Sequence, residues 1–291
     1  MAHILTLVAA RDATTLSPAV IARVREAVAG GEPDILSARE AADIPCPAAP
    51  DMARVEAALE GLPIDAIATK ARGRRKGLLV ADMDSTIVTS ETLDEIAAFA
   101  GLKDRIAAIT ARSMNGEIDF KDALRERVAM LKGLSLEALE KTWQATRLTP
   151  GAAALVATMR AHNATTALVS GGFTFFTGRV AERVGFDIHR SNTLLHADGK
   201  LTGMVGEPIL DRDAKLTTLQ ELATARRLKL SATLAVGDGA NDLAMLQAAG
   251  LGVAFHAKPV VALAVRARVD HADLRALLFA QGYRAADIRA G

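Results

Sequence analysis

Four short apolar runs, each ending in a polar or glycine-rich segment, constrain the fold of this chain more than any other feature. They cover residues 78–81, 166–169, 233–236 and 251–255, and helical segments follow the first three. Continuous apolar runs of this length are typical of strands whose two faces are both covered by helices. The sequence therefore predicts an α/β fold built on a parallel sheet.

Polar side chains follow these runs at the strand ends, where ligands of parallel sheets bind. The first run continues into Asp82-Met83-Asp84-Ser85-Thr86. In an extended segment residues two apart point the same way, so the carboxylates of Asp82 and Asp84 should converge. Adjacent carboxylates repel and lose hydration, and Mg²⁺ meets the resulting need for a cation because it prefers oxygen ligands. Taken alone, the pentapeptide also fits a solvated turn.

The other strand ends carry groups that could bind the same cation or an anionic ligand. Ser170-Gly171-Gly172 offers a hydroxyl and backbone amides that an anion can approach closely, although alone it is more often a turn. The segment 237–242, Gly-Asp-Gly-Ala-Asn-Asp, places Asp238 where it can join Asp82 and Asp84 around one cation. Lys215 could neutralise phosphate charge, but a single lysine is usually a surface residue, and its assignment depends on the whole set.

From about residue 77 to 255 the chain resembles the haloacid dehalogenase superfamily of phosphohydrolases. Asp82-x-Asp84-x-Thr86 is similar to the first motif of that family, Ser170 to the second, Lys215 to the third and Gly237-Asp238-Gly239-x-Asn241-Asp242 to the fourth. All four occur in the expected order. The resemblance implies a Rossmann-like core and dependence on Mg²⁺.

The resemblance also implies roles for these residues. Asp82 would attack phosphorus to form an aspartyl phosphate, and Asp84 would protonate the leaving oxygen and later deprotonate water. Ser170 and Lys215 would complete the catalytic set, since phosphoryl transfer needs charge stabilisation more than covalent chemistry. The implied metal ligands are Asp82, Asp238 and Asp84, the last through its backbone carbonyl.

The segment from about 90 to 150 is rich in helical signals and longer than a strand crossover requires. It predicts a helical cap inserted after the first strand of the core. The cap contains Met114-Asn115, Phe120 and 124–128, Leu-Arg-Glu-Arg-Val, a pattern similar to that of the phosphoserine phosphatase family. Glu91, nine positions after Asp82, is also similar.

This narrower resemblance implies that Glu91 binds the substrate ammonium, that Arg127 binds its carboxylate, and that Phe120 and Met114 exclude water. From the pattern alone, Arg127 could instead lie on an exposed helix face and Phe120 in the core. The complete implied set of substrate-binding residues is Glu91, Met114, Phe120, Arg127, Ser170, Gly171, Lys215 and Asn241.

The implied function is hydrolysis of O-phospho-L-serine to L-serine and phosphate, the last step of serine biosynthesis. Two alternatives remain open at this point. The enzyme could hydrolyse another small phosphomonoester or transfer the phosphoryl group to an acceptor such as homoserine. The chain could also be a non-catalytic amino-acid sensor, although the intact set of Asp82, Asp84, Lys215 and Asp238 argues against that alternative.

Residues 1–72 predict a separate α+β domain, followed by the phosphatase domain over 73–291. We expect a strand at 4–9, a helix at 18–29, one or two strands around 34–44, a helix at 52–62 and a strand at 64–68. This order resembles an ACT-like domain, which implies possible regulation by an amino acid; a structural role or a homodimer is equally open. The basic segment 70–76 is predicted to be a solvated linker. The chain beyond Val260 is predicted to be helix that completes the fold, and no catalytic or binding residue is assigned there.

Composition narrows the partners and the compartment. The chain has 35 basic and 34 acidic residues, which gives no electrostatic argument for nucleic acid or an anionic membrane. Its single cysteine, Cys46, excludes an intramolecular disulfide and fits a reducing compartment as a small semi-buried residue. The N-terminus shows no cleavable leader, and no run reaches membrane-spanning length. We expect a cytoplasmic protein with a small-molecule substrate.

Overall fold

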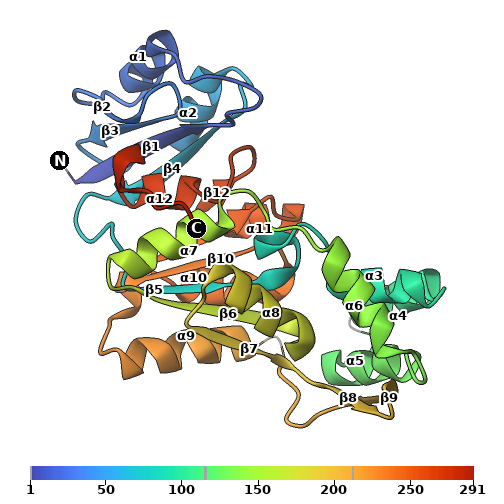
Figure 1. Ribbon diagram of the computed structural model, residues 1–291. Coiled ribbons are helices and arrows are strands. Elements are labelled where there is room, and N and C mark those ends of the chain that lie inside the picture. The colour runs from blue at the N-terminus through green and yellow to red at the C-terminus, as the bar shows by residue number, and fades with distance from the viewer. Residues whose placement is uncertain (1, 115–116, 212) are drawn as a thin grey trace.

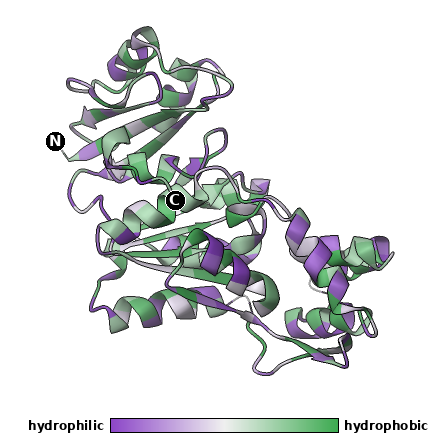
Figure 2. Cartoon of the chain, in the orientation of Figure 1, coloured by the Kyte–Doolittle hydropathy of each residue, from purple (hydrophilic) through white to green (hydrophobic). Residues whose placement is uncertain are grey.

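The computed structural model describes residues 2–114, 117–211 and 213–291. Figure 1 shows three parts: a small N-terminal sheet with its helices, a larger central sheet, and a helical cap beside the central sheet. Hydrophobic residues concentrate along the strands of both sheets (Figure 2). In the described ranges we find no helix with both the length and the apolar character that crossing a membrane requires.

The N-terminal part has the element order β-α-β-β-α-β of ferredoxin-like folds. Its sheet has the order β2-β3-β1-β4, with antiparallel neighbours. Both strands expected around residues 34–44 form. The bounds are β1 (His3–Ala9), α1 (Pro18–Ala27), β2 (Asp34–Ser37), β3 (Ala41–Cys46), α2 (Met52–Leu59) and β4 (Ile64–Lys70). This part has a hydrophobic core of its own, in which Cys46 is buried.

The central sheet is entirely parallel and has the order β12-β11-β10-β5-β6-β7. The predicted parallel sheet and the Rossmann-like architecture are therefore confirmed. Its strands are β5 (Leu78–Ala81), β6 (Thr165–Phe173), β7 (Ile188–Asn192), β10 (Thr233–Gly237), β11 (Leu251–Phe255) and β12 (Ala267–Val269). The accompanying helices are α7 (Ala152–Ala161), α8 (Thr174–Val184), α9 (Ala214–Ala225), α10 (Leu243–Ala248), α11 (Pro259–Ala264) and α12 (Ala276–Ala280).

The strand order explains where a ligand would bind. β5 lies between β10 and β6, so the carboxyl ends of three neighbouring strands meet at one edge of the sheet. Asp82 and Asp238 directly follow β5 and β10, and Ser170 lies within the last four residues of β6. In open parallel sheets this edge is the usual location of a ligand.

The cap consists of α3 (Thr92–Phe99), α4 (Lys103–Met114), α5 (Phe120–Ala129) and α6 (Leu136–Ala145). A hairpin of β8 (Leu194–Ala197) and β9 (Lys200–Val205) reaches across to it from a later part of the chain (Figure 1). The amide of Gly133 donates to the carbonyl of Leu201 at 2.8 Å, and α5 packs against β9. This hairpin lies outside the predicted cap at about 90–150.

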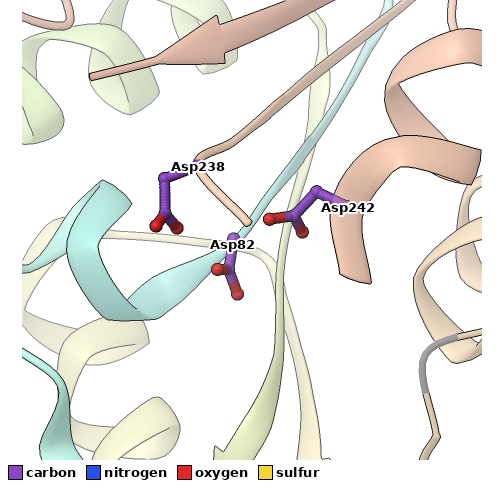
Figure 3. A group of neighbouring side chains, drawn as sticks. All are labelled: Asp82, Asp238 and Asp242. Carbon is purple, nitrogen blue, oxygen red and sulfur yellow. The ribbon is translucent and has the colours of Figure 1, made fainter. Parts of the chain in front are cut away.

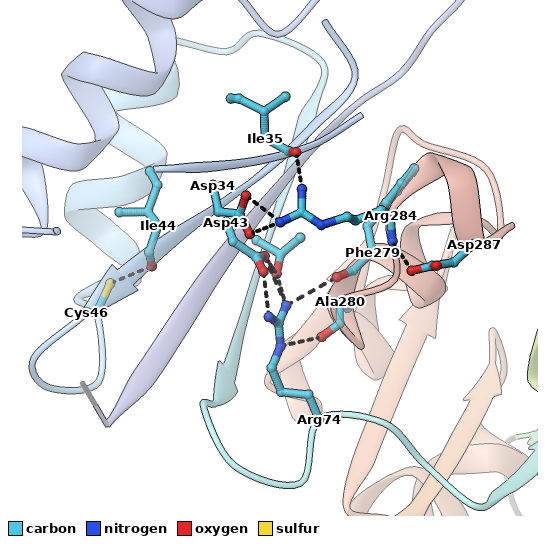
Figure 4. Close-up of polar contacts among 11 residues, drawn as sticks. Asp34, Ile35, Asp43, Ile44, Cys46, Arg74, Phe279, Ala280, Arg284 and Asp287 are labelled. Atoms are coloured by element: carbon cyan, nitrogen blue, oxygen red, sulfur yellow. Dashed lines mark hydrogen bonds and ion pairs between the residues drawn. The ribbon is translucent and has the colours of Figure 1, made fainter. Parts of the chain in front are cut away.

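The prediction of a solvated linker at 70–76 is wrong for Arg74. Its guanidinium forms a largely buried ion pair with Asp43 of β3 at 2.5 Å. It also donates to the carbonyl oxygens of Phe279 and Ala280, as Figure 4 shows. The C-terminal segment packs on the N-terminal sheet and presents these carbonyls to the linker, which a local sequence pattern cannot reveal.

Candidate active site

The turn after β5 gives Asp82 and Asp84 different surroundings. The amide of Asp82 donates to the carbonyl of Val236 at 3.0 Å, which continues the strand pairing with β10. The chain then turns over residues 83–87, with Ser85 in the left-handed region at φ 54°. Because this segment is not extended throughout, the two carboxylates contact different partners.

Three buried carboxylates form the centre of the site. The side chains of Asp82, Asp238 and Asp242 point toward one another (Figure 3), and each has an oxygen within 4.8 Å of the others. Asp238 follows β10 directly, and Asp242 lies one helical turn further along the chain. The amide of Gly239 donates to Oδ2 of Asp242 at 3.0 Å. A β-carbon on Gly237 would lie 2.3 Å from Cγ of Asp242, so glycine is required there.

Lys215, in the first turn of α9, supplies the cation nearest to this cluster. Its Nζ lies 2.7 Å from Oδ1 of Asp82 and 2.5 Å from Oδ1 of Asp242. Burial would lower the pKa of Lys215, but Asp242 and Asp82 raise it above its ordinary value. The ammonium group is therefore held in its charged form.

The negative charge of the three carboxylates nevertheless exceeds the positive charge of Lys215. Burial and the neighbouring Asp242 raise the pKa of Asp82 well above its ordinary value, and they raise that of Asp238 to about 6. Carboxylates with raised pKa values need a compensating proton or cation. Three carboxylates at a strand edge suit a divalent metal that prefers hard oxygen ligands.

Asp84 lies in a separate hydrogen-bonded position. Its Oδ1 accepts from the amide of Thr92 at 2.9 Å, and its Oδ2 accepts from the hydroxyl of Ser170 at 3.2 Å. Burial and the charge of Glu91 raise the pKa of Asp84 to about 6. A carboxyl group with this pKa can hold a proton near neutral pH and release it again.

Ser170 and its glycine neighbours form the wall beside Asp84. The Ser170 hydroxyl accepts from the amide of Gly172 at 2.8 Å, and a β-carbon on Gly172 would lie 3.1 Å from Oδ2 of Asp84. The side-chain Nδ2 of Asn192, buried at the end of β7, donates to the carbonyl of Gly171 at 2.9 Å. Asn192 thus fixes this loop, a role that the sequence analysis did not assign.

The predicted substrate-binding residues of the cap approach the same region. Glu91 accepts from the Ser85 hydroxyl at 2.9 Å. Phe120 faces Gly171, since a β-carbon there would lie 3.6 Å from Cζ of the ring.

Arg127 is the partly buried cation of the cap. It donates to the carbonyl of Ala123 at 3.2 Å and to the hydroxyl of Thr110 at 3.4 Å. Burial lowers its pKa, whereas the charges of Asp94 and Glu91 act in the opposite direction. Within the described part of the chain its guanidinium forms no ion pair at 4.0 Å or less. The Arg127 guanidinium can therefore bind an anionic group of a ligand.

Asn241 and Met114 are the two remaining predicted substrate-binding residues. Asn241 is exposed, and its side-chain oxygen lies against Gly239. The side chain of Met114 is outside the described residues. Thr92 and Asp242 belong to the site, although neither was predicted to have a role; Asp242 was named only as the last residue of the fourth motif, at 237–242.

Comparisons with known proteins agree with this architecture. The family model of the haloacid dehalogenase-like hydrolases matches residues 79–247. A phosphoserine phosphatase of Lactococcus lactis is 43% identical over 203 residues, which cover 70% of this chain and 94% of that protein. A phosphoserine phosphatase of Streptomyces coelicolor is also 43% identical, over 81% of this chain. The chain spans only 57% of the Streptomyces protein.

A solved structure shows the same overall arrangement. The unliganded crystal structure of a probable phosphoserine phosphatase from Vibrio cholerae superposes with a TM-score of 0.80 at 33% identity. The superposition covers 98% of this chain and 88% of that one, so it includes the N-terminal part as well as the core and the cap.

Proposed function

We propose that this chain, which belongs to the haloacid dehalogenase-like hydrolases, is a phosphoserine phosphatase that hydrolyses O-phospho-L-serine to L-serine and phosphate. One observation carries the proposal. Two carboxyl groups of a single turn have different environments, Asp82 beside the Lys215 ammonium and Asp84 hydrogen-bonded to Thr92 and Ser170. One group is suited to attack and the other to transfer protons.

In the first step a carboxylate oxygen of Asp82 attacks phosphorus. A P–O bond to Asp82 forms while the bond from phosphorus to the serine oxygen breaks, which leaves an aspartyl phosphate. Asp84, protonated at the start, gives its proton to the departing serine oxygen. Lys215 and the hydroxyl of Ser170 offset negative charge around the transferred group.

In the second step Asp84 acts as a general base. Its carboxylate accepts a proton from a water molecule as the water oxygen attacks phosphorus. The P–O bond to Asp82 breaks, inorganic phosphate leaves, and both aspartates return to their initial states. A single group with a pKa of about 6 can serve both steps.

We propose Mg²⁺ as the ion that the carboxylate cluster holds. Asp82 and Asp238 would be its side-chain ligands and the backbone carbonyl of Asp84 a third, with Asp242 adjacent. The ion would offset negative charge on the phosphate oxygens. The buried carboxylates with raised pKa values support this assignment.

Substrate selection would depend on the cap. Phosphoserine carries an ammonium and a carboxylate beside its phosphate, and Glu91 and Arg127 offer the complementary charges. The position of Phe120 against Gly171 would exclude water from the reacting groups. Serine biosynthesis as the pathway and the cytoplasm as the location follow from this proposal.

The assignment is tested by comparing kcat/KM for O-phospho-L-serine, O-phospho-L-threonine and glycerol phosphate. We expect phosphoserine to exceed glycerol phosphate by at least about 10²-fold, because glycerol phosphate lacks both charged groups that the cap would bind. Similar values for all three substrates would contradict phosphoserine as the substrate. Amino-acid binding by residues 1–72 and a homodimer formed through them remain predictions from the sequence.

A further inference from the structure

The N-terminal part contacts a segment that leads back to the active site. Asp65, on β4, is 5% exposed, and its carboxylate accepts hydrogen bonds from three consecutive backbone amides of the core. Asp270 donates at 2.7 Å to one oxygen, Ala272 donates at 2.7 Å to the other, and the amide of His271 donates to both at 3.2 Å. An ionised carboxylate is well suited to fix three such amides together.

The segment fixed by Asp65 in turn holds His256. The Nε2–H of His256 donates to the carbonyl of Ala272 at 2.9 Å, and its backbone amide donates to the carbonyl of Val269 at 2.7 Å. His256 directly follows β11 and has φ 43°, in the left-handed region that disfavours residues other than glycine. Its hydrogen bonds to Val269, the last residue of β12, and to Ala272 stabilise this conformation.

The turn at His256 sets the position of a residue in the carboxylate cluster. Two residues later, the backbone amide of Lys258 donates to the backbone carbonyl of Asp238 at 3.1 Å, and its Nζ lies 3.8 Å from the Asp238 carboxylate. Hydrogen bonds therefore connect Asp65 to Ala272 and Ala272 to His256, and two residues along the chain Lys258 is hydrogen-bonded to Asp238.

We propose that Asp65 is a positioning residue for the metal ligand Asp238, so that the N-terminal part contributes to metal affinity through His256. This inference rests on the proposed metal role of Asp238, but not on the identity of the substrate. Asp65 touches neither substrate nor metal. It acts by ordering the backbone that keeps His256 in its left-handed turn.

The test is direct metal binding to the full chain, measured as the Mn²⁺ dissociation constant by electron paramagnetic resonance. We expect Asp65→Asn to raise this constant by about 3- to 30-fold, since its amide group would face backbone N–H donors. Loss of a group hydrogen-bonded directly to a metal ligand costs about 10- to 100-fold, and Asp65 acts through several intervening residues. His256→Ala should have a similar effect. The double variant should bind no more weakly than the weaker single variant, because both changes break one series of contacts.

A matched control tests whether the loss of any contact between the N-terminal part and the core weakens Mn²⁺ binding. Asp34→Asn makes the same chemical change in another contact between the two parts, the exposed ion pair of Asp34 with Arg284 shown in Figure 4. We expect its Mn²⁺ constant to equal that of the wild type.

Three results would overturn the proposal. The first is an unchanged Mn²⁺ dissociation constant in folded Asp65→Asn, and the second is an equal increase of that constant in Asp34→Asn. The third is a double variant in which the increases of the two single variants multiply. If Asp65→Asn does not fold, an unchanged constant in His256→Ala overturns it. Failure of the proposed substrate would appear separately, as a flat specificity profile with Mn²⁺ binding intact.

Discussion

The Nζ atom of Lys215 lies 2.7 Å from Oδ1 of Asp82, with both side chains almost completely buried. The same nitrogen contacts Asp242, so one ammonium group holds the proposed nucleophile at a fixed distance from a second carboxylate. Without that charge, burial and the neighbouring carboxylates would disfavour the ionised form of Asp82.

Replacing Lys215 with methionine should therefore weaken catalysis strongly. We expect kcat to fall by about 10²- to 10³-fold, as for the loss of a preorganised charge in other enzymes. The pKa of Asp82 should rise further, which moves the acidic limb of the kcat/KM profile to higher pH. Activity within threefold of the wild type, with an unchanged profile, would show that Lys215 has no part in charge stabilisation.

Asp84→Asn should separate the two chemical steps. Loss of the general acid should lower kcat for phosphoserine by about 10²- to 10⁴-fold. With p-nitrophenyl phosphate, whose leaving group needs little protonation, we expect a rapid release of one equivalent of nitrophenol followed by slow turnover. Stopped-flow absorbance measures this release. Equal losses for both substrates without a burst would argue against proton transfer by Asp84.

Arg127→Ala should affect only substrates that carry a carboxylate. We expect kcat/KM for phosphoserine to fall by about 30-fold or more, the usual effect of removing one member of a buried charge pair, and that for glycerol phosphate to change little. Arg112→Ala is the matched control, because Arg112 is an exposed cap arginine paired with Glu126. Parallel losses for both substrates would indicate a structural role for Arg127.

Metal removal should make stability depend on pH in a defined direction. The pKa values of Asp84 and Asp238, about 6 in the folded chain without metal, exceed their ordinary values, so folding favours their protonated forms. The stabilisation from these protons is present at low pH and is lost as the pH rises through about 6. A metal binds the deprotonated carboxylates.

Thermal unfolding measures this effect. We expect the increase in Tm caused by saturating Mg²⁺ to be larger at pH 8 than at pH 5, and to be much reduced in Asp238→Asn. An increase that is independent of pH, or that persists in Asp238→Asn, would place the ion elsewhere.

The sequence predicted the core and much of the site because both depend on local patterns. The apolar runs at 78–81 and 233–236 are fully buried neighbouring strands, and the polar residues directly after them lie together at the sheet edge. The motif resemblance then distinguished Asp82, Asp84 and Lys215 from ordinary turn and surface residues. The structure places all three within one site.

The features that were missed depend on contacts between distant parts of the chain. Arg74 is buried because the C-terminal segment presents the carbonyls of Phe279 and Ala280 to it, more than 200 residues later in the chain. The β8–β9 hairpin belongs beside the cap only because α5 packs on it. Asn192 and Asp65 likewise act through backbone groups, which leave no signal in the residues that they contact.

Trapping the covalent intermediate would show whether Asp82 carries the phosphoryl group. The enzyme is mixed with excess phosphoserine and Mg²⁺, quenched in acid, and reduced with borohydride, which converts an aspartyl phosphate into homoserine. Peptide mass spectrometry then locates the converted residue. We predict homoserine at position 82 in the wild type, and none there in Asp82→Asn or without substrate. Homoserine at another aspartate, or full turnover in Asp82→Asn, would contradict it.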